Sequence, residues 1–262
     1  MYTKRGKIEM VYIVAIFVAL MLYMWIEAHR NRVIFHSLPF PTFPESFSRF
    51  RIFFISDIHR RRVSKTLIGS LKGKVDLVII GGDLTEKGVP FSRVKRNIEL
   101  LKQLGPVYFV WGNNDYEVDY HELDALLLEN GVKILDNTAV TFESEQGDRI
   151  ALLGVDDMNK RRDRLELALS DAEHTTFRIL VSHDPRIIEK IKPQHEIALV
   201  LSGHTHGGQI RLGPFGLYEK GCLRNINGTM LLVSNGYGTT TLPFRFGARA
   251  ETHLIELKHK RS

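Results

Sequence analysis

Along most of the chain, short apolar runs alternate with segments in which apolar residues recur at a helical spacing. Short, β-rich apolar runs at 51–56, 75–81 and 106–112 predict buried strands. Apolar residues at 91–104 recur at a helical spacing, and a second helix is predicted at 120–129. This first half has the order βαβαβα, which predicts parallel strands in an α/β fold.

The second half is richer in strands. A helix is predicted at 162–172, and a shorter one after Pro185, where proline suits the first turn. Six apolar runs predict the strands at 139–142, 149–154, 177–182, 197–202, 229–234 and 253–257. Two sheets packed together, with helices on their outer faces, would bury this pattern.

A different pattern precedes these elements. Residues 10–26 carry no charge, and as a helix they would span roughly 25 Å, the short edge of what a bilayer needs. A cleaved signal peptide would need a small-x-small site after the run, and 25–30 offers none. A buried core helix is the other alternative, but this run is apolar all round. We therefore predict a transmembrane anchor at 10–26, preceded by a basic tail at 1–9.

The segment after the anchor, 27–48, contains three prolines alternating with aromatic residues. Because proline interrupts helices, we expect an extended tether here, followed by one folded domain at 49–262. Three basic residues precede the apolar run and two follow it closely: Lys4, Arg5 and Lys7, then Arg30 and Arg32. This difference of one charge favours a single-pass protein of the cell membrane whose catalytic domain is extracytoplasmic.

The composition excludes few classes of protein. A length of 262 residues suits one large domain, and Cys222 is the single cysteine, so an internal disulfide is excluded. The net charge of +6 comes partly from basic clusters at 60–62, 160–162 and 258–261. No nucleic-acid-binding motif accompanies them, so no specific nucleic acid is expected. An anionic membrane surface or a solvated face accounts for them equally well.

Polar side chains suited to binding metals follow the predicted strands. Because ligands collect at the carboxyl ends of strands in open α/β sheets, we expect these side chains to converge on one edge. Oxygen and nitrogen donors without cysteine describe a hard-metal site that favours hydrolysis over redox chemistry. The candidates are Asp57, His59, Asp83, Asn113, His183, His204 and His206.

The ordered series also resembles a known family. Asp57-x-His59, Gly82-Asp83, Gly112-Asn113, His183 and Gly203-His204-x-His206 are similar to the motifs of the calcineurin-like metallophosphoesterase superfamily, over about 49–257. The segments 203–210 and 234–245 further resemble its bacterial membrane-associated branch. The resemblance implies a four-layer α/β/β/α sandwich.

The resemblance also implies two divalent metal ions that share Asp83 as a bridging ligand. Asp57, His59 and His206 would complete the first metal site, and Asn113, His183 and His204 the second. Two such ions can hold a hydroxide and clamp a phosphoryl group for in-line attack. Mn²⁺, Fe and Zn²⁺ all suit these ligands, so the metal stays open.

The sequence departs from the family at one catalytic position. The family commonly has a histidine after the asparagine of its third motif, where Asn114 stands here. An asparagine side chain can hydrogen-bond a phosphate oxygen but cannot act as a general acid. Either His121, the nearest histidine, takes the role, or the leaving group needs no protonation. Arg60 or Arg61 is a candidate for binding a substrate phosphate, against the alternative of a solvated basic face.

These features predict a membrane-anchored, dinuclear phosphoesterase that cleaves phosphodiester or pyrophosphate bonds. The anchor points to a lipid-linked or cell-envelope substrate. Examples are the pyrophosphate bond within a UDP-diacylglucosamine and the phosphodiesters of a cell-wall polymer. The alternative is a non-catalytic scaffold or binding protein with the same fold. Such scaffolds are expected to lose metal ligands, whereas this chain keeps all seven positions.

Overall fold

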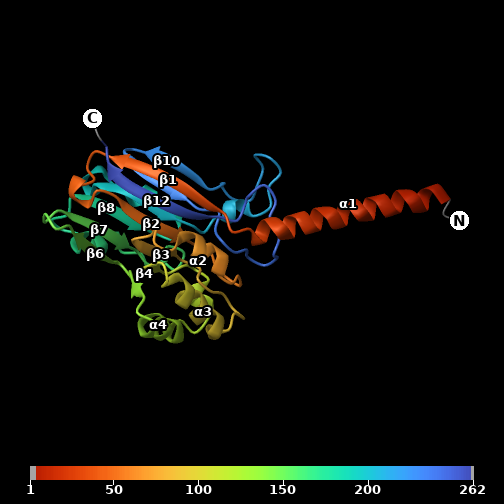
Figure 1. Cartoon of the computed structure of the whole chain (residues 1–262), viewed down its shortest axis with the longest axis horizontal. Coiled ribbons are helices and arrows are strands. Elements are labelled where there is room, and N and C mark those ends of the chain that lie inside the picture. The colour runs from red at the N-terminus through yellow and green to blue at the C-terminus, as the bar shows by residue number, and fades with distance from the viewer. Residues whose placement is uncertain (1–3, 261–262) are drawn as a thin grey trace.

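Two six-stranded sheets lie face to face in the computed structural model, which describes residues 4–260 (Figure 1). The first sheet has the order β1 (Val33–Phe40), β12 (Thr252–His259), β2 (Phe50–Ile55), β3 (Leu77–Gly81), β4 (Val107–Val110) and β5 (Lys133–Ile134). The second has the order β10 (Cys222–Ile226), β11 (Thr229–Val233), β9 (Ile197–Ser202), β8 (Phe177–Val181), β7 (Arg149–Gly154) and β6 (Thr138–Glu143). Strands β2, β3, β4 and β5 are parallel, as the alternating pattern of the first half predicts.

Helices cover the outer faces of both sheets. The helices α2 (Lys65–Leu71), α3 (Phe91–Leu101) and α4 (Tyr120–Glu129) belong to the first half, and α5 (Leu165–Ser170) to the second. Alternate residues of a strand face opposite sides. In β2, Phe53 packs in the apolar cluster that includes α2 and α3, while Ile52 packs between the sheets. A third cluster joins the second sheet to Ala168 of α5. The predicted four-layer sandwich is confirmed.

The helix after Pro185 is a 3-10 helix, Pro185–Lys190, and α5 is shorter than predicted. Besides β1 and the short 3-10 helices, three of the described elements were not predicted: α2, β5 and β10. All three are short or largely exposed, so that they carry a weak hydrophobic period.

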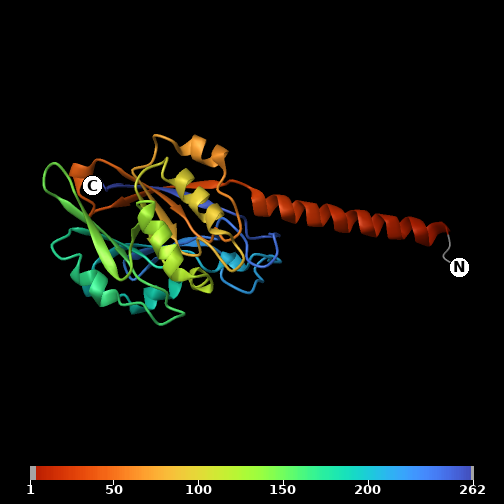
Figure 2. The ribbon, with the colours of Figure 1, turned by 90° about the horizontal axis from the view of Figure 1, so that it is seen from below.

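The long helix α1 (Lys4–His29) projects from the sandwich (Figures 1 and 2). Its stretch Gly6–His29 is long and apolar enough to cross a membrane, and only 6% of its most apolar window is buried. The predicted anchor, 10–26, lies within it. The helix continues three residues further, and its last turns enter the domain, where Met24, Glu27 and Ala28 are buried.

The segment 27–48 is not a tether, and this prediction was wrong. Its central part forms β1, an edge strand that pairs in parallel with β12 over eight residues, from Val33 opposite Thr252 to Phe40 opposite His259. An edge strand has a neighbour on one side only, so Pro39 can be accommodated. Pro39 is therefore compatible with a strand at the edge of the sheet, and the other two prolines, Pro41 and Pro44, follow that strand.

Removing β1 should destabilise the protein. A truncation of residues 1–43 uncovers the edge of β12 and the core around Leu38 and Phe43. We therefore expect the free energy of unfolding to fall by several kcal/mol and the protein to aggregate. A truncation of residues 1–23 is the control, because the side chains at 6–23 are mostly exposed and Met24 is kept. Urea unfolding in detergent compares the two, and equal midpoints would contradict the role of β1.

Candidate metal centre

The seven candidate metal-binding residues lie in loops that leave the carboxyl ends of β2, β3, β4, β8 and β9. Backbone hydrogen bonds join the first two loops, from Asp57 N to Gly82 O (3.0 Å) and from His59 N to Asp83 O (3.1 Å). A third bond runs from His204 N to Asp57 Oδ1 (3.0 Å). One edge of the two sheets therefore collects these residues, as expected from the strand-end rule.

Five of the seven candidates have left-handed backbone conformations: Asp57, His59, Asp83, His204 and His206, with φ between 49° and 70°. Such conformations cost about 1–3 kcal/mol each in a residue that is not glycine, and they cluster at functional sites. The hydrogen bonds between the loops hold this strain in place. The backbone is thus shaped to bring the side chains together.

Four of these side chains form a compact cluster. The ligand atoms of Asp57, His59, Asp83 and His206 all lie within 4.8 Å of one another, and all four residues are buried. His59 Nε2 is 3.0 Å from His206 Nε2, which is itself 3.3 Å from Asp57 Oδ1. Two carboxylates and two imidazoles that point at one small space suit a divalent cation.

The same Asp83 carboxylate also faces His183, which in turn contacts His204. Its Oδ2 lies 3.2 Å from His183 Nε2, and His183 Nε2 lies 3.2 Å from His204 Nδ1. Asn113 Oδ1 and Asp57 Oδ2 are buried and have no hydrogen-bond partner among the described residues. Unpaired buried oxygens are costly unless a cation contacts them. The donor set therefore fits metal ions on both sides of Asp83.

The charges of the cluster favour a cation. Burial opposes ionisation of Asp83, but His183 and His59 outweigh it and hold its pKa below the usual range. Burial lowers the pKa of His206 to about 3, which keeps this imidazole neutral. Burial would also lower the pKa of His183, but the Asp83 carboxylate overcomes it and raises that pKa to about 10. A bound metal would take the place of that proton.

Glu86 supports the cluster and was not predicted from the sequence. Its Oε2 lies 3.0 Å from His59 Nδ1, on the side of the ring away from Asp83. A carboxylate in this position fixes the tautomer and orientation of a ligating histidine. The only sign of this role in the sequence is that Glu86 is an acidic residue three positions after Asp83, close to the end of a strand.

Replacing Glu86 with glutamine should weaken metal binding by about 10- to 100-fold, since the carboxylate that orients His59 loses its charge. Glu99→Gln on α3 is the control, because Glu99 pairs with Arg96 at the surface. Metal titrations of both purified variants measure the effect, and equal affinities would exclude an orienting role for Glu86.

Asp115 is a second supporting residue without a predicted role. Its buried carboxylate accepts hydrogen bonds from the backbone N–H groups of Asp83 (2.8 Å), Thr85 (3.0 Å) and Gly112 (2.9 Å). Burial and the nearby charge of Asp83 raise its pKa to about 7. The three hydrogen bonds of Asp115 join the loop after β3 to the loop after β4.

The two candidate catalytic residues, Asn114 and His121, lie in different surroundings. Asn114 borders the cluster, since its backbone N–H donates to Asp83 Oδ1 (2.8 Å) and its Nδ2 donates to Glu117 Oε1 (3.0 Å). His121 lies exposed in the first turn of α4, where its ring contacts Tyr120 at 4.1 Å between centroids. The described contacts of His121 do not include the cluster.

The two candidate arginines have structural partners. Arg60 Nε donates to Glu86, and its side chain stays 63% exposed. The guanidinium of Arg61 donates to the carbonyl oxygens of Tyr237, His29 (2.6 Å) and Arg30 (3.0 Å), and it lies 3.6 Å above the Tyr237 ring. Arg61 thus joins the end of α1 to the loop after β2. A role of Arg60 or Arg61 in binding a substrate phosphate stays a prediction.

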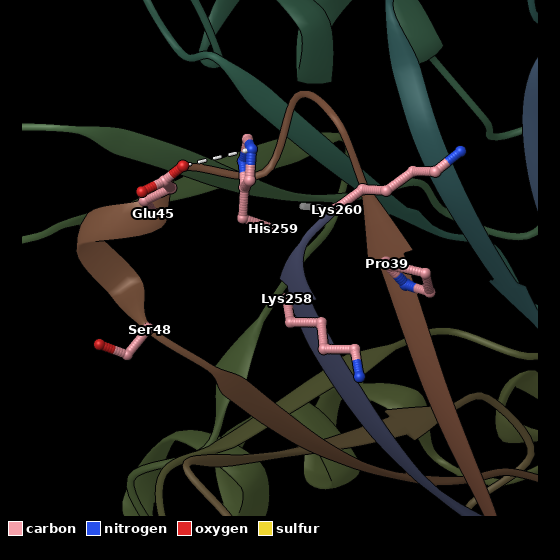
Figure 3. Close-up of a pocket in the computed structure, with 6 residues that line it drawn as sticks. All are labelled: Pro39, Glu45, Ser48, Lys258, His259 and Lys260. Atoms are coloured by element: carbon pink, nitrogen blue, oxygen red, sulfur yellow. Dashed lines mark ion pairs between the residues drawn. The ribbon is translucent and has the colours of Figure 1, made fainter. Parts of the chain in front are cut away.

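A pocket of about 640 Å³ lies at the opposite edge of the first sheet (Figure 3). It is lined by Pro39, Glu45, Ser48, Lys258, His259 and Lys260, and the figure shows the ion pair between Glu45 and His259 (3.4 Å). These residues lie at the carboxyl ends of β1 and β12 or precede β2, whereas Asp57 and His59 of the cluster follow the carboxyl end of β2. The pocket is therefore separate from the cluster.

Comparison with known proteins gives consistent matches. The family described as calcineurin-like phosphoesterase matches residues 50–208. The uncharacterized protein YpbG of Bacillus subtilis (strain 168) is 48% identical over 208 residues, which cover 79% of this chain and 80% of YpbG. Phosphodiesterase YaeI of Escherichia coli (strain K12) is 27% identical, with 89% and 88% covered. A transmembrane protein with metallophosphoesterase domain from Danio rerio is 33% identical over 88% of this chain and 58% of that protein.

Proposed function

Because this chain belongs to the calcineurin-like phosphoesterase family, whose members hydrolyse phosphoester bonds, we propose that it acts on lipid-linked phosphodiesters or pyrophosphates at a membrane. We assign Asp57, His59 and His206 to one metal ion, and Asn113, His183 and His204 to a second. The observation that carries this assignment is the position of Asp83, whose Oδ2 lies 3.7 Å from His59 Nε2 and 3.2 Å from His183 Nε2.

The ions, when bound, would lower the pKa of a water molecule and neutralise charge on the phosphoryl group. This chain's own residues fix where that chemistry occurs. Glu86 orients His59, and the carbonyl of Gly81 lies 2.8 Å from His183 Nδ1, which leaves Nε2 of that ring free to face Asp83. Mn²⁺, Fe and Zn²⁺ remain compatible with this oxygen and nitrogen donor set.

Asn114 restricts the leaving groups that the site can release. Its amide can donate a hydrogen bond to a phosphoryl oxygen but holds no proton to transfer. His121 lies exposed on α4 and lacks a described contact with the cluster, so we favour cleavage without a general acid. A nucleotide or other phosphate leaving group meets this requirement because it leaves readily as an anion.

Leaving-group dependence tests this restriction. In a series of aryl phosphodiesters, we expect kcat/KM of the wild type to fall steeply as the pKa of the phenol rises. Asn114→His should flatten the dependence, because the imidazole can protonate the leaving oxygen. His121→Ala is the control and should leave the slope unchanged. A shallow slope in the wild type would contradict cleavage without an acid.

The position of the cluster supports a membrane substrate. Arg61, two residues after His59, hydrogen-bonds the carbonyls of His29 and Arg30 at the end of α1. Tyr237 OH also lies 2.9 Å from Asn31 Oδ1. The proposed metal site therefore lies on the side of the sandwich from which α1 leaves, so a membrane that holds α1 would lie beside it.

A substrate screen tests the proposed function. Full-length protein in nanodiscs, supplied with Mn²⁺, should hydrolyse nucleotide-lipid pyrophosphates or lipid-linked phosphodiesters more efficiently than soluble phosphomonoesters. Metal-loaded protein without any turnover would favour the non-catalytic scaffold.

Protease protection of a C-terminal tag in cells tests the extracytoplasmic placement that the basic residues favour.

A further inference from the structure

Large apolar side chains are exposed on two loops beside the metal candidates. In the first loop, Leu212, Phe215 and Leu217 are 70%, 77% and 88% exposed, and in the second loop Leu242 is 54% exposed. Tyr218 adds a fifth apolar side chain, and we call these five residues the apolar tips. Exposed apolar groups gathered in one place mark an interaction surface.

The first loop has a defined shape that keeps its apolar side chains outside. Leu212 and Phe215 exchange backbone hydrogen bonds of 3.0 and 3.1 Å. From within, the buried guanidinium of Arg211 donates to the carbonyls of Pro214 (2.6 Å) and Gly207 (3.1 Å). Hydrogen bonds to the buried Arg211 side chain therefore hold the loop, and the apolar side chains of the loop lie outside the core.

The two loops are joined to each other and to the end of α1. Gln209 Nε2 donates to the carbonyl of Leu242 (2.9 Å), and Phe246 N donates to Gln209 O (3.0 Å). The Phe246 ring packs edge-on against Tyr23, at 6.1 Å between centroids. Figures 1 and 2 show the corresponding blue loops at the base of α1, on the side toward which the helix projects.

We propose that the apolar tips insert into the lipid interface beside α1, as a second membrane contact that holds the metal site against the bilayer. The proposal rests on the proposed membrane function. The lipid-facing part of α1 ends at about Tyr23, because Met24 is buried in the domain and Met24 O accepts from Arg245 N (3.0 Å). The loops that pack around this point meet the bilayer surface where the helix leaves it.

Charge and chain connectivity agree with a lipid partner. Exposed Arg30 and Arg249 lie at the base of α1, where both approach Glu27, and they suit anionic headgroups. The first loop packs on the turn after the metal candidate His206, since Gly208 lies close to the backbone nitrogens of Leu217 and Tyr218. Insertion of the apolar tips would therefore bring headgroup phosphates toward the metal site.

Fluorescent labelling tests the insertion. The full-length Cys222→Ser protein carries a single cysteine labelled with an environment-sensitive dye at Leu217, at Val14 in α1, or at Leu128, an exposed control on α4. The labelled proteins are placed in phosphatidylglycerol–phosphatidylcholine vesicles that contain doxyl-labelled lipids. We expect several-fold stronger quenching at Leu217→Cys than at Leu128→Cys, and strong quenching at Val14→Cys.

Each other outcome counts against the proposal in a distinct way. Quenching at Val14→Cys but equal, weak quenching at Leu217→Cys and Leu128→Cys would overturn insertion while leaving the anchor intact. A blue-shifted dye at Leu217→Cys without quenching would overturn insertion and indicate that a second copy of the chain covers the loop instead. Weak quenching at Val14→Cys would overturn the anchor and the insertion together.

Activity gives a second readout that separates insertion from catalysis. The triple variant Leu212→Ser, Phe215→Ser, Leu217→Ser changes exposed side chains only. We expect unchanged hydrolysis of bis(p-nitrophenyl) phosphate in solution and about 10-fold slower hydrolysis of hexadecyl p-nitrophenyl phosphate in vesicles. Equal rates on the vesicle substrate would contradict the proposal, whereas inactivity of the wild type on both esters would contradict the proposed function.

Discussion

Replacing Asp83 with asparagine is expected to reduce phosphodiester hydrolysis by about 10³-fold or more. The Asp83 carboxylate faces His183 at 3.2 Å and belongs to the cluster of Asp57, His59 and His206. Its neutral amide would no longer balance the charge of two cations, and metal-assisted charge stabilisation contributes several kcal/mol, at about 1.4 kcal/mol per tenfold change in rate. The measurement is kcat/KM for bis(p-nitrophenyl) phosphate with added Mn²⁺.

The matched control is Glu145→Gln, the same change from carboxylate to amide at an exposed position between β6 and β7. Its activity should equal that of the wild type. Circular dichroism and thermal unfolding check that the Asp83→Asn variant is folded. An active Asp83→Asn variant with normal metal content would show that the bridging assignment is wrong.

Replacing Gly82 with alanine is expected to lower activity by about 10²-fold without unfolding the protein. The added Cβ would lie 2.5 Å from His183 Nδ1, so the imidazole must move away from Asp83. Displacement of a catalytic group by about 1 Å can cost this much in rate. The measurements are kcat/KM and the affinity for the second metal ion.

The control for Gly82→Ala is Gly88→Ala. Gly88 has φ of 86°, close to the 83° of Gly82, but open space surrounds its added Cβ. Both variants should lose about 1–2 kcal/mol of stability, because alanine is strained at positive φ. Equal activities of the two variants would show that backbone strain, and not displacement of His183, limits the reaction.

The sequence predicted the metal candidates because of one topological rule. Apolar runs buried on both faces are visible in a sequence, and the residues that end parallel strands must meet at one edge. His183 and His204 could therefore be placed beside Asp83 despite the 100 or more positions between them. The left-handed backbone of these residues could not be predicted, because contacts between loops impose it.

The contributions of β1, Glu86 and Arg61 were not predicted for a related reason. Strand β1 joins the sheet through β12, more than 200 positions away, and its prolines pointed to an unpaired segment. Glu86 acquires its role only through His59, and Arg61 through carbonyl groups at the end of α1. Local patterns carry little information about such long-range partners.

Metal titration of the active protein tests the central assignment most directly. Full-length protein is depleted of metal with a chelator and titrated with Mn²⁺ while hydrolysis of bis(p-nitrophenyl) phosphate is followed. A dinuclear centre bridged by Asp83 predicts negligible hydrolysis before the titration and a plateau at two equivalents of Mn²⁺ per chain. Full hydrolysis without metal, or a plateau at one equivalent, would contradict it.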